Sequence, residues 1–313
     1  MRYNTYGFYM VIDEIAEERF KMSNSSPLRY PGGKRRLVPF ISLLIKKSGI
    51  VAPIYIEPFA GGAGVGLELL FNGEVDAIVI NDYDKAIYSM WRAILTETHK
   101  FVNLIKAATF DDNEWRRQKH IYLTQNSKYS LELGFATFYL NRTNRSGILS
   151  AGPIGGHNQT GNYRMDVRFN KDDLIKRVYK VASYKHKIHL YNQDVRSFVK
   201  YYGAKYFDRA FIYFDPPYYQ KGKQLYKNFL NHKDHVEIKD LVVKLQCPWI
   251  VTYDNASEIK DMYNDYPAYK YDLYYGVANG GTNSEIIFFS GMHLVPTQSE
   301  LDDNGIKINF RKA

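Results

Sequence analysis

The stretch YFDPPYY, residues 213–219, places one carboxylate between an apolar run and two prolines. The run itself, AFIYF at 210–214, predicts a short strand buried on both faces. Neither proline has an N–H to donate to a sheet, so the strand must end where the prolines begin. Asp215 is therefore predicted just past the carboxyl end of a strand, and in an open α/β sheet ligands bind at that edge.

These residue types could activate an amino group on a nucleobase. The lone pair of such a nitrogen is delocalised into the ring, which makes the nitrogen a poor nucleophile. The Asp215 carboxylate and the rigidly held Pro216 carbonyl can accept its two N–H bonds and direct the lone pair toward an electrophile. The Tyr218 ring can stack on the base, which is worth roughly 1–3 kcal/mol. A base in a duplex would first have to leave the helix.

Three further motifs lie upstream. A glycine loop, EPFAGGAG at 57–64, lets the backbone approach a ligand closely, although its spacing fits neither the dinucleotide nor the phosphate-loop pattern. Asp82 ends the next apolar run, where an acid can accept both hydroxyls of a ribose. Tyr30 precedes a Pro-Gly-Gly turn that ends in Lys34. Taken singly, each motif also fits an ordinary turn or helix start.

Strands and helices must alternate along the chain to position these residues. Two strand-like runs within 271–289 predict an antiparallel pair at one edge. Together the pattern predicts an α/β fold, with a doubly wound, mainly parallel, seven-stranded Rossmann-like sheet. The other predicted strands are 54–56, 77–80, 188–191, 210–214 and 249–253, and the predicted helices are 84–95, 195–202 and 235–245.

Residues 98–185 break this rhythm and predict an inserted, smaller domain of helices and loops. Within 115–187 there are 14 Lys and Arg residues against four acids, an excess as large as the net charge of +9 of the whole chain. Such a segment is typical of a surface that faces a polyanion, and a solvated basic face is the alternative. The predicted domains are 1–97 with 186–313, which form the catalytic domain, and 98–185, which reads the target.

Composition excludes several classes of protein. The chain of 313 residues has one cysteine, Cys247, so an internal disulfide and a multi-cysteine zinc site are excluded. No run is long and apolar enough for a membrane span, and acidic residues near the start replace the apolar block of a signal peptide. We therefore expect a cytoplasmic protein.

Taken together, these motifs resemble the Dam-like DNA adenine methyltransferases. The matching stretches, in that family's order, are YPGGK at 30–34, EPFAGGAG at 57–64, Asp82, NQD at 192–194 and DPPY at 215–218. The stretch FYLNRTNRSGIL at 138–149 is similar to the family's target-recognition region. The resemblance covers residues from about 27 to 290.

The resemblance implies S-adenosylmethionine as the methyl donor, no metal, and double-stranded DNA as the partner. It further implies transfer to the exocyclic amine of a flipped-out adenine, by a monomer that a cognate restriction endonuclease could accompany. Asp215, Pro216 and Tyr218 match the catalytic positions. The positions implied to bind the donor are Tyr30, Lys34, Phe59, Ala60, Gly61, Asp82, Asp194 and Asp215.

The predicted contacts to DNA are Arg142, Asn144 and Arg145, because arginine commonly pairs with guanine and asparagine with adenine. Arg142 could equally serve only to hold its loop. The position of Tyr30 is often tryptophan in the family, a change that keeps a ring. The segment before about residue 25 and the tail after Met292 match nothing in the family and are expected to be ordinary termini.

Two alternatives use the same pocket chemistry. A methyltransferase acting on the exocyclic amine of cytosine needs the same acceptors, although the aspartate before PPY favours adenine. An adenine methyltransferase acting on RNA, or an enzyme acting on a protein amine, would differ only in what residues 98–185 recognise. A decayed DNA-binding protein is disfavoured because each matched position retains a chemically competent residue.

Overall fold

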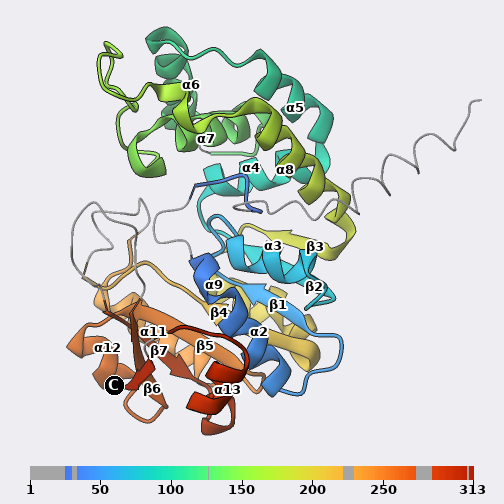
Figure 1. The fold of residues 1–313 in the computed structure, drawn as a ribbon, viewed down its shortest axis with the longest axis vertical. Helices are drawn as coiled ribbons and strands as arrows, with labels where there is room; N and C mark the ends of the chain where they lie inside the picture. The colour runs from blue at the N-terminus through green and yellow to red at the C-terminus, as the bar shows by residue number, and fades with distance from the viewer. Residues whose placement is uncertain (1–24, 30–33, 126, 221–228, 273–283, 309) are drawn as a thin grey trace, which may run out of the picture.

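The computed structural model of the chain describes residues 25–29, 34–125, 127–220, 229–272, 284–308 and 310–313. The five apolar runs predicted as parallel strands form the centre of the molecule, as Figure 1 shows. Three of them, β1, β2 and β4, are buried along their whole length, which explains why their apolar residues run continuously instead of alternating. The strands are β1 (Ile54–Glu57), β2 (Ala77–Asn81), β3 (Ile188–Tyr191), β4 (Ala210–Phe214) and β5 (Trp249–Asp254).

The remaining strands run antiparallel to their neighbours. Strand β7 (Ser284–Phe289) pairs with both β5 and β6 (Ala268–Asp272), and β8 (Phe310–Lys312) pairs with β6. In the described residues the sheet therefore has eight strands, in the order β3-β2-β1-β4-β5-β7-β6-β8. An antiparallel pair at this edge is confirmed, although β6 begins at Ala268, ahead of the predicted range, and residues 273–283 lie outside the described residues.

The prediction of an α/β fold is confirmed, but the predicted count of seven strands is wrong, because the sheet is a mixed one of eight strands that gains β8 from the tail. Three residues, FRK, give no strand pattern by themselves. The strand forms because the Phe310 ring stacks on the Tyr269 ring, with centroids 4.4 Å apart. The expectation of an ordinary C-terminal tail is wrong for the same reason.

Helices cover both faces of this sheet and enclose two hydrophobic cores. Side chains that alternate along each strand point to one core or the other: Tyr55 and Ile78 belong to one, Ile56 and Val79 to the second. The helices are α2 (Val38–Lys47), α3 (Gly64–Phe71), α4 (Lys85–Thr96), α9 (Val195–Ser197), α11 (His232–Val242), α12 (Ser257–Met262) and α13 (Gln298–Asp303).

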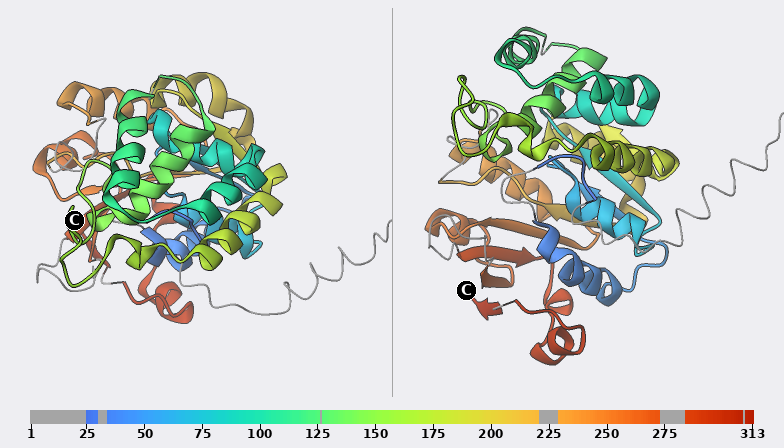
Figure 2. Two further views of the ribbon diagram at one scale, coloured as in Figure 1. Left: turned by 90° about the horizontal axis from the view of Figure 1, so that it is seen from above. Right: turned by 45° about the horizontal axis from the view of Figure 1, so that its top comes forward.

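The segment predicted as an insertion forms a layer of helices above the sheet, as both views of Figure 2 show. Its side chains, such as Phe101 and Phe138, continue the hydrophobic core that α3 and α4 form on the sheet. Helices α4 and α7 cross so closely that a Cβ on Gly134 would lie 2.6 Å from the Ser89 carbonyl oxygen. The layer consists of α5 (Thr98–Ala107), α6 (Asp112–Thr124), α7 (Leu131–Thr143) and α8 (Lys171–Ser183).

Candidate active site

Asn81, the last residue of β2, joins the loops that follow three parallel strands. Its side-chain amide donates to the carbonyls of Pro58 (3.0 Å) and Gln193 (3.1 Å), and its side-chain oxygen accepts from the Gln193 N–H (2.9 Å). The loops after β1, β2 and β3 are thus held side by side at the carboxyl edge of the sheet. Sequence reasoning missed Asn81, although a polar residue at the end of an apolar run is a usable signal.

The glycine loop after β1 is fixed by contacts to the next strand and helix. The Ala60 N–H donates to the Asn81 carbonyl (2.9 Å), and the Trp91 indole N–H donates to the Gly61 carbonyl (2.9 Å). Gly61 takes a φ of +46°, a left-handed conformation that glycine adopts without steric cost. Phe59 is half-buried in this loop, and Ala60 and Gly61 are buried.

Asp82, which directly follows β2, binds the backbone of the glycine loop with its side chain. One carboxylate oxygen accepts from the Gly61 N–H (2.9 Å) and the other from the Asp84 N–H (2.8 Å). Each oxygen has a second lone pair, so the side chain can still accept hydroxyl groups. Burial, together with the neighbouring Asp84, raises the pKa of Asp82 to about 7 against the opposing effect of the two backbone hydrogen bonds.

Asp194 lies at the start of α9, beyond the end of β3. Its side chain caps the helix by accepting from the Arg196 N–H (2.9 Å), and its carboxylate pairs with the Arg196 guanidinium (2.9 and 2.8 Å). These Arg196 contacts lower the pKa of Asp194 below its ordinary value. The residue is therefore an ionised acceptor that is already shared with an arginine.

Asp215 follows β4 directly, as the two prolines predict. Its Oδ1 accepts from the Thr252 hydroxyl on β5 (2.7 Å), which in turn contacts the Tyr213 hydroxyl (2.9 Å). Burial raises the pKa of Asp215 above its ordinary value, and Lys34 opposes that rise. Within the described part of the chain, no hydrogen bond to Oδ2 is found. One oxygen is thus anchored, and the other can accept from a ligand.

The backbone after the prolines is held by a second carboxylate. Asp254, at the end of β5, accepts from the N–H groups of Tyr219 (2.8 Å) and Gln220 (2.9 Å). Pro216 is buried, and Pro217 and Tyr218 are half-buried. The run DPPY is therefore fixed at both ends, by Thr252 and Asp254, neither of which the motif alone indicates.

Lys34 and Tyr218 meet at a buried acid on β7, Glu285. The Lys34 ammonium donates to Glu285 and to the Tyr218 hydroxyl (3.2 Å), and it lies 3.6 Å from Asp215 Oδ1. The Tyr218 hydroxyl donates to the other Glu285 oxygen (2.7 Å). The structure thus brings Lys34, Asp215 and Tyr218 together as predicted, whereas Tyr30 lies outside the described residues.

Sequence reasoning missed Glu285, which is 3% exposed. The usable signal was an acid inside the apolar run SEIIFF, because a buried acid requires a partner. That partner, Lys34, lies 251 positions away along the chain.

The predicted recognition residues are placed differently from one another. The Arg142 guanidinium is buried and donates to the Pro27 carbonyl, while Asn144 is fully buried and accepts from the Trp115 indole N–H (2.7 Å). Burial lowers the pKa of Arg142 to about 9. Arg145 is exposed. The geometry favours the alternative in which Arg142 holds a loop, and it leaves Arg145 accessible to DNA.

The loop that Arg142 holds leads into the lysine motif. Ser26 donates from its hydroxyl to the Gly62 carbonyl (2.6 Å), and Arg29 exchanges two hydrogen bonds with the Asn141 side chain (both 2.7 Å). Residues 25–29 accordingly run between the helical layer and the glycine loop, as Figure 1 shows. Helix α7 thus positions the chain just before Tyr30.

Replacing Arg142 or Arg145 by alanine should have different effects on stability and on DNA binding. Arg142→Ala is expected to lower the free energy of unfolding by roughly 1–3 kcal/mol, because the Pro27 carbonyl loses its buried donor. Arg145→Ala should change stability by less than about 0.5 kcal/mol and instead weaken duplex binding by roughly 1–3 kcal/mol. Urea unfolding and DNA titrations at two salt concentrations measure both effects. Equal stability with weaker binding for Arg142→Ala would contradict the loop role.

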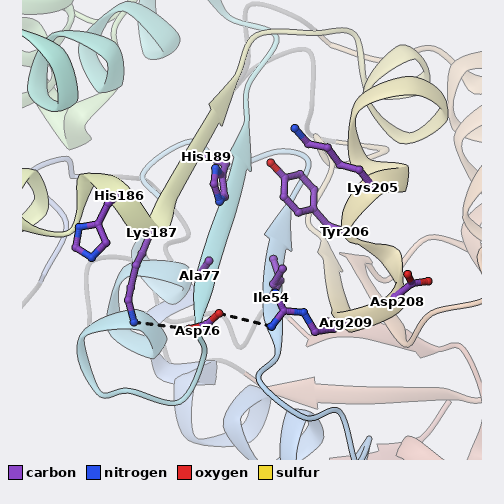
Figure 3. A pocket seen from close by; sticks show the side chains of 10 residues that line it. All are labelled: Ile54, Asp76, Ala77, His186, Lys187, His189, Lys205, Tyr206, Asp208 and Arg209. Carbon is purple, nitrogen blue, oxygen red and sulfur yellow. Dashed lines mark ion pairs between the residues drawn. The ribbon is translucent and has the colours of Figure 1, made fainter.

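A separate hollow of about 420 Å³ lies at the opposite, amino ends of the strands, as Figure 3 shows. Ile54 and Ala77, which begin β1 and β2, line it, and Asp76 pairs there with Lys187 (3.7 Å) and Arg209 (3.6 Å). Because parallel strands all end at the same edge, this hollow is distinct from the candidate active site.

The described residues contain neither a candidate membrane span nor a candidate metal site. None of their helices has the length and apolar character needed to cross a membrane. Nor do His, Cys, Asp or Glu side chains among them gather in threes as a metal site would require.

Two solved structures show a distant likeness to this chain. Protein LPL1258 from Legionella pneumophila is 14% identical, with 87% of this chain and 88% of that chain covered and a TM-score of 0.34. The rRNA methyltransferase aviRa from Streptomyces viridochromogenes is 12% identical, with 90% and 96% covered and a TM-score of 0.38. Among curated proteins, no sequence matches this chain.

The model of one protein family matches most of this chain. It matches residues 30–276, which include Lys34, the glycine loop, Asp82, Asp194 and the DPPY run. The match spans well over half of the 313 residues and contains most of the site residues described above, although Glu285 lies beyond its end. This chain belongs to the D12 class N6 adenine-specific DNA methyltransferases.

Proposed function

We propose that the protein methylates the exocyclic amine of adenine at a specific sequence in duplex DNA, with S-adenosylmethionine as the donor. The observation that carries this proposal is the environment of Asp215, whose Oδ1 is anchored by Thr252 while Oδ2 accepts no hydrogen bond from the described residues. A carboxylate fixed in this way, beside the Pro216 carbonyl, can accept both N–H bonds of an amine.

The residues at the carboxyl edge fit such a donor. Gly64 has open space beside it, because a Cβ placed there would meet no described atom within 4 Å. Asp82 retains lone pairs for ribose hydroxyls, and Asp194 is an ionised acceptor one loop away. When bound, S-adenosylmethionine supplies a methyl group on a positively charged sulfur. Phe59, Ala60 and Gly61 would line its methionine part.

The residues of the DPPY run would do the remaining work. Asp215 and Pro216 orient the amine so that its nitrogen lone pair points at the methyl carbon. The N–C bond forms as the S–C bond breaks, and the nitrogen then gives up a proton. Asp215 is a suitable acceptor for that proton, since burial raises its pKa above the ordinary value. Tyr218 would stack on the adenine after it leaves the duplex.

The target and partners complete the proposal. We assign residues 98–185 to target recognition, with Arg145 as a DNA contact, and residues 1–97 with 186–313 to catalysis. The basic excess of 115–187 supports a polyanionic target. We also propose that the protein acts as a monomer, and that a cognate restriction endonuclease accompanies it.

Product analysis tests the proposed reaction. The protein is incubated with unmethylated duplex DNA and S-adenosylmethionine, and the digested nucleosides are identified by mass spectrometry. Methyladenosine carrying the methyl group on its exocyclic nitrogen is expected. Methylcytidine would overturn the choice of base, and transfer to RNA but not to DNA would overturn the choice of target.

Donor affinity should depend on pH through Asp82. Its pKa is raised to about 7, so its ionised fraction rises between pH 6 and 8, and hydroxyl groups donate more strongly to the ionised form. We expect the donor Kd to fall by about tenfold over that range. Calorimetric titration of S-adenosylmethionine at pH 6, 7 and 8 measures this effect.

Asp82→Asn removes the titrating group and should flatten the profile. Asp76→Asn, the same change at the amino end of the sheet, should preserve it. If the donor Kd of Asp82→Asn still changes with pH near pH 8, that change would come from Glu57, whose pKa burial raises to about 8. A flat wild-type profile would contradict the role of Asp82.

A further inference from the structure

Glu285 is the one described side chain that contacts Lys34, Tyr218 and Tyr271 together. Its Oε2 accepts from the Lys34 ammonium and from the Tyr271 hydroxyl (2.5 Å), and its Oε1 accepts from the Tyr218 hydroxyl (2.7 Å). Burial alone would raise its pKa, but Lys34 and the two tyrosines lower it below the ordinary value. Glu285 is therefore an ionised carboxylate inside the sheet, paired with an ammonium at the edge of the candidate active site.

The Lys34 ammonium lies between two carboxylates that compete for it. It contacts Glu285 directly and forms a longer ion pair with Asp215, whose Oδ1 lies 3.6 Å from the Lys34 nitrogen. A close pair with Asp215 would occupy lone pairs and neutralise the charge that makes this carboxylate a strong acceptor. The position of Lys34 thus determines whether Asp215 can serve an amine.

We propose that Glu285 is a positioning residue, which keeps the Lys34 ammonium from a closer hydrogen bond to Asp215 and fixes the Tyr218 hydroxyl. The Asp215 carboxylate then stays available for the target amine, and the Tyr218 ring keeps one orientation. This inference rests on the proposed function, because it concerns the same amine.

The rest of the network supports this division of roles. Thr252 already orients Asp215 through Oδ1, so Lys34 is not needed for that purpose. The Lys34 ammonium also lies 5.3 Å from the centre of the Tyr218 ring, so a shift of Lys34 toward Asp215 would disturb the stacking residue as well. Glu285 therefore acts on Tyr218 directly through Oε1, and on Asp215 indirectly through Oε2 and Lys34.

Glu285→Gln tests the proposal because it keeps the shape of the side chain and removes its charge. The Lys34 ammonium should then pair with Asp215, and kcat should fall by at least about tenfold. The Kd of S-adenosylmethionine should change by less than about threefold, since the donor site lies at the glycine loop. Wild-type kcat in Glu285→Gln would overturn the proposal.

Two further variants separate positioning from packing. Tyr271→Phe removes one hydrogen bond to Glu285 but leaves its carboxylate with Lys34 and Tyr218, so kcat should stay within about threefold of wild type. Glu285→Asp retains the charge and should recover part of the activity that Glu285→Gln loses. Equal losses in Tyr271→Phe and Glu285→Gln would indicate a packing role and overturn the proposal.

A double variant and a crystal structure test whether Glu285 affects Asp215 through Lys34. In a Lys34→Met background there is no ammonium to hold, so adding Glu285→Gln should cost less than it does in the wild type. Undiminished cost would overturn the proposal. A crystal structure of Glu285→Gln should show the Lys34 nitrogen within hydrogen-bond distance of Asp215, and an unmoved Lys34 would overturn it too.

These readouts also distinguish this inference from the proposed function. If the wild type transfers no methyl group to adenine in DNA, the proposed function fails, while the position of Lys34 in the variant structure still tests Glu285. If the wild type is active and Lys34 does not move, only the role of Glu285 fails. Thermal unfolding of each variant checks that it folds.

Discussion

Asp215→Asn is expected to lower kcat by on the order of a thousandfold while leaving the Kd of S-adenosylmethionine within about threefold. The variant keeps the size of the side chain but loses the negative charge that an amine N–H needs as its acceptor. Thr252 donates to Oδ1 in the wild type, so the asparagine oxygen should take that place and turn its NH₂ group toward the substrate. The NH₂ group of the asparagine, a hydrogen-bond donor, would then face the N–H donors of the target amine.

Single-turnover methylation of a duplex, together with calorimetric donor binding, measures both quantities. Asp265→Asn makes the same chemical change at an exposed position and should leave both values unchanged. Asp215→Ala should lose at least as much activity as Asp215→Asn. Wild-type kcat in either Asp215 variant would remove this residue from the proposed site.

Tyr218→Ala is expected to lower kcat/KM for DNA by on the order of a hundredfold. Stacking of a base on an aromatic ring contributes roughly 1–3 kcal/mol, and alanine also leaves the Glu285 oxygen without the hydroxyl that donates to it at 2.7 Å. Tyr218→Phe keeps the ring and loses only the hydroxyl, which donates to Glu285 and accepts from Lys34, so most of kcat/KM should remain.

Steady-state kinetics on a duplex containing the target sequence provides the comparison. Tyr219→Phe, at the neighbouring position, loses a hydroxyl that contacts His232 (2.9 Å) and should behave like the wild type. If Tyr218→Phe were as impaired as Tyr218→Ala, the hydroxyl rather than the ring would be the important group. That result would contradict the stacking role.

Much of the candidate site could be predicted because its signals are local. Two prolines after an apolar run fix the end of β4 wherever the strand packs, and so they place Asp215 at the carboxyl edge. The same reasoning applies to the glycine loop after β1 and to Asp82 after β2. Parallel strands then bring these three loops to one edge, which is why the prediction joined residues distant in sequence.

The recognition residues show where local reasoning fails. Arg142, Asn144 and Arg145 lie within four positions, and nothing in their residue types separates a DNA contact from a structural support. The difference arises because Arg142, in the last turn of α7, donates to Pro27, and Asn144, the C-cap of that helix, accepts from Trp115, while Arg145 is exposed. Side-chain direction depends on packing that the stretch itself does not encode.

The sequence by itself determined the α/β class, the five central strands, the order of the motifs and the place of Asp215 just after β4. These properties depend on neighbouring residues, since strand periodicity and proline geometry act over a few positions. Only the tertiary structure decided that Glu285 and Lys34 meet across 251 positions, that Thr252 anchors Asp215, and that Phe310 adds an eighth strand. Such contacts depend on how separate elements pack, because a buried charge or a short edge strand is stable only where a distant segment supplies its partner.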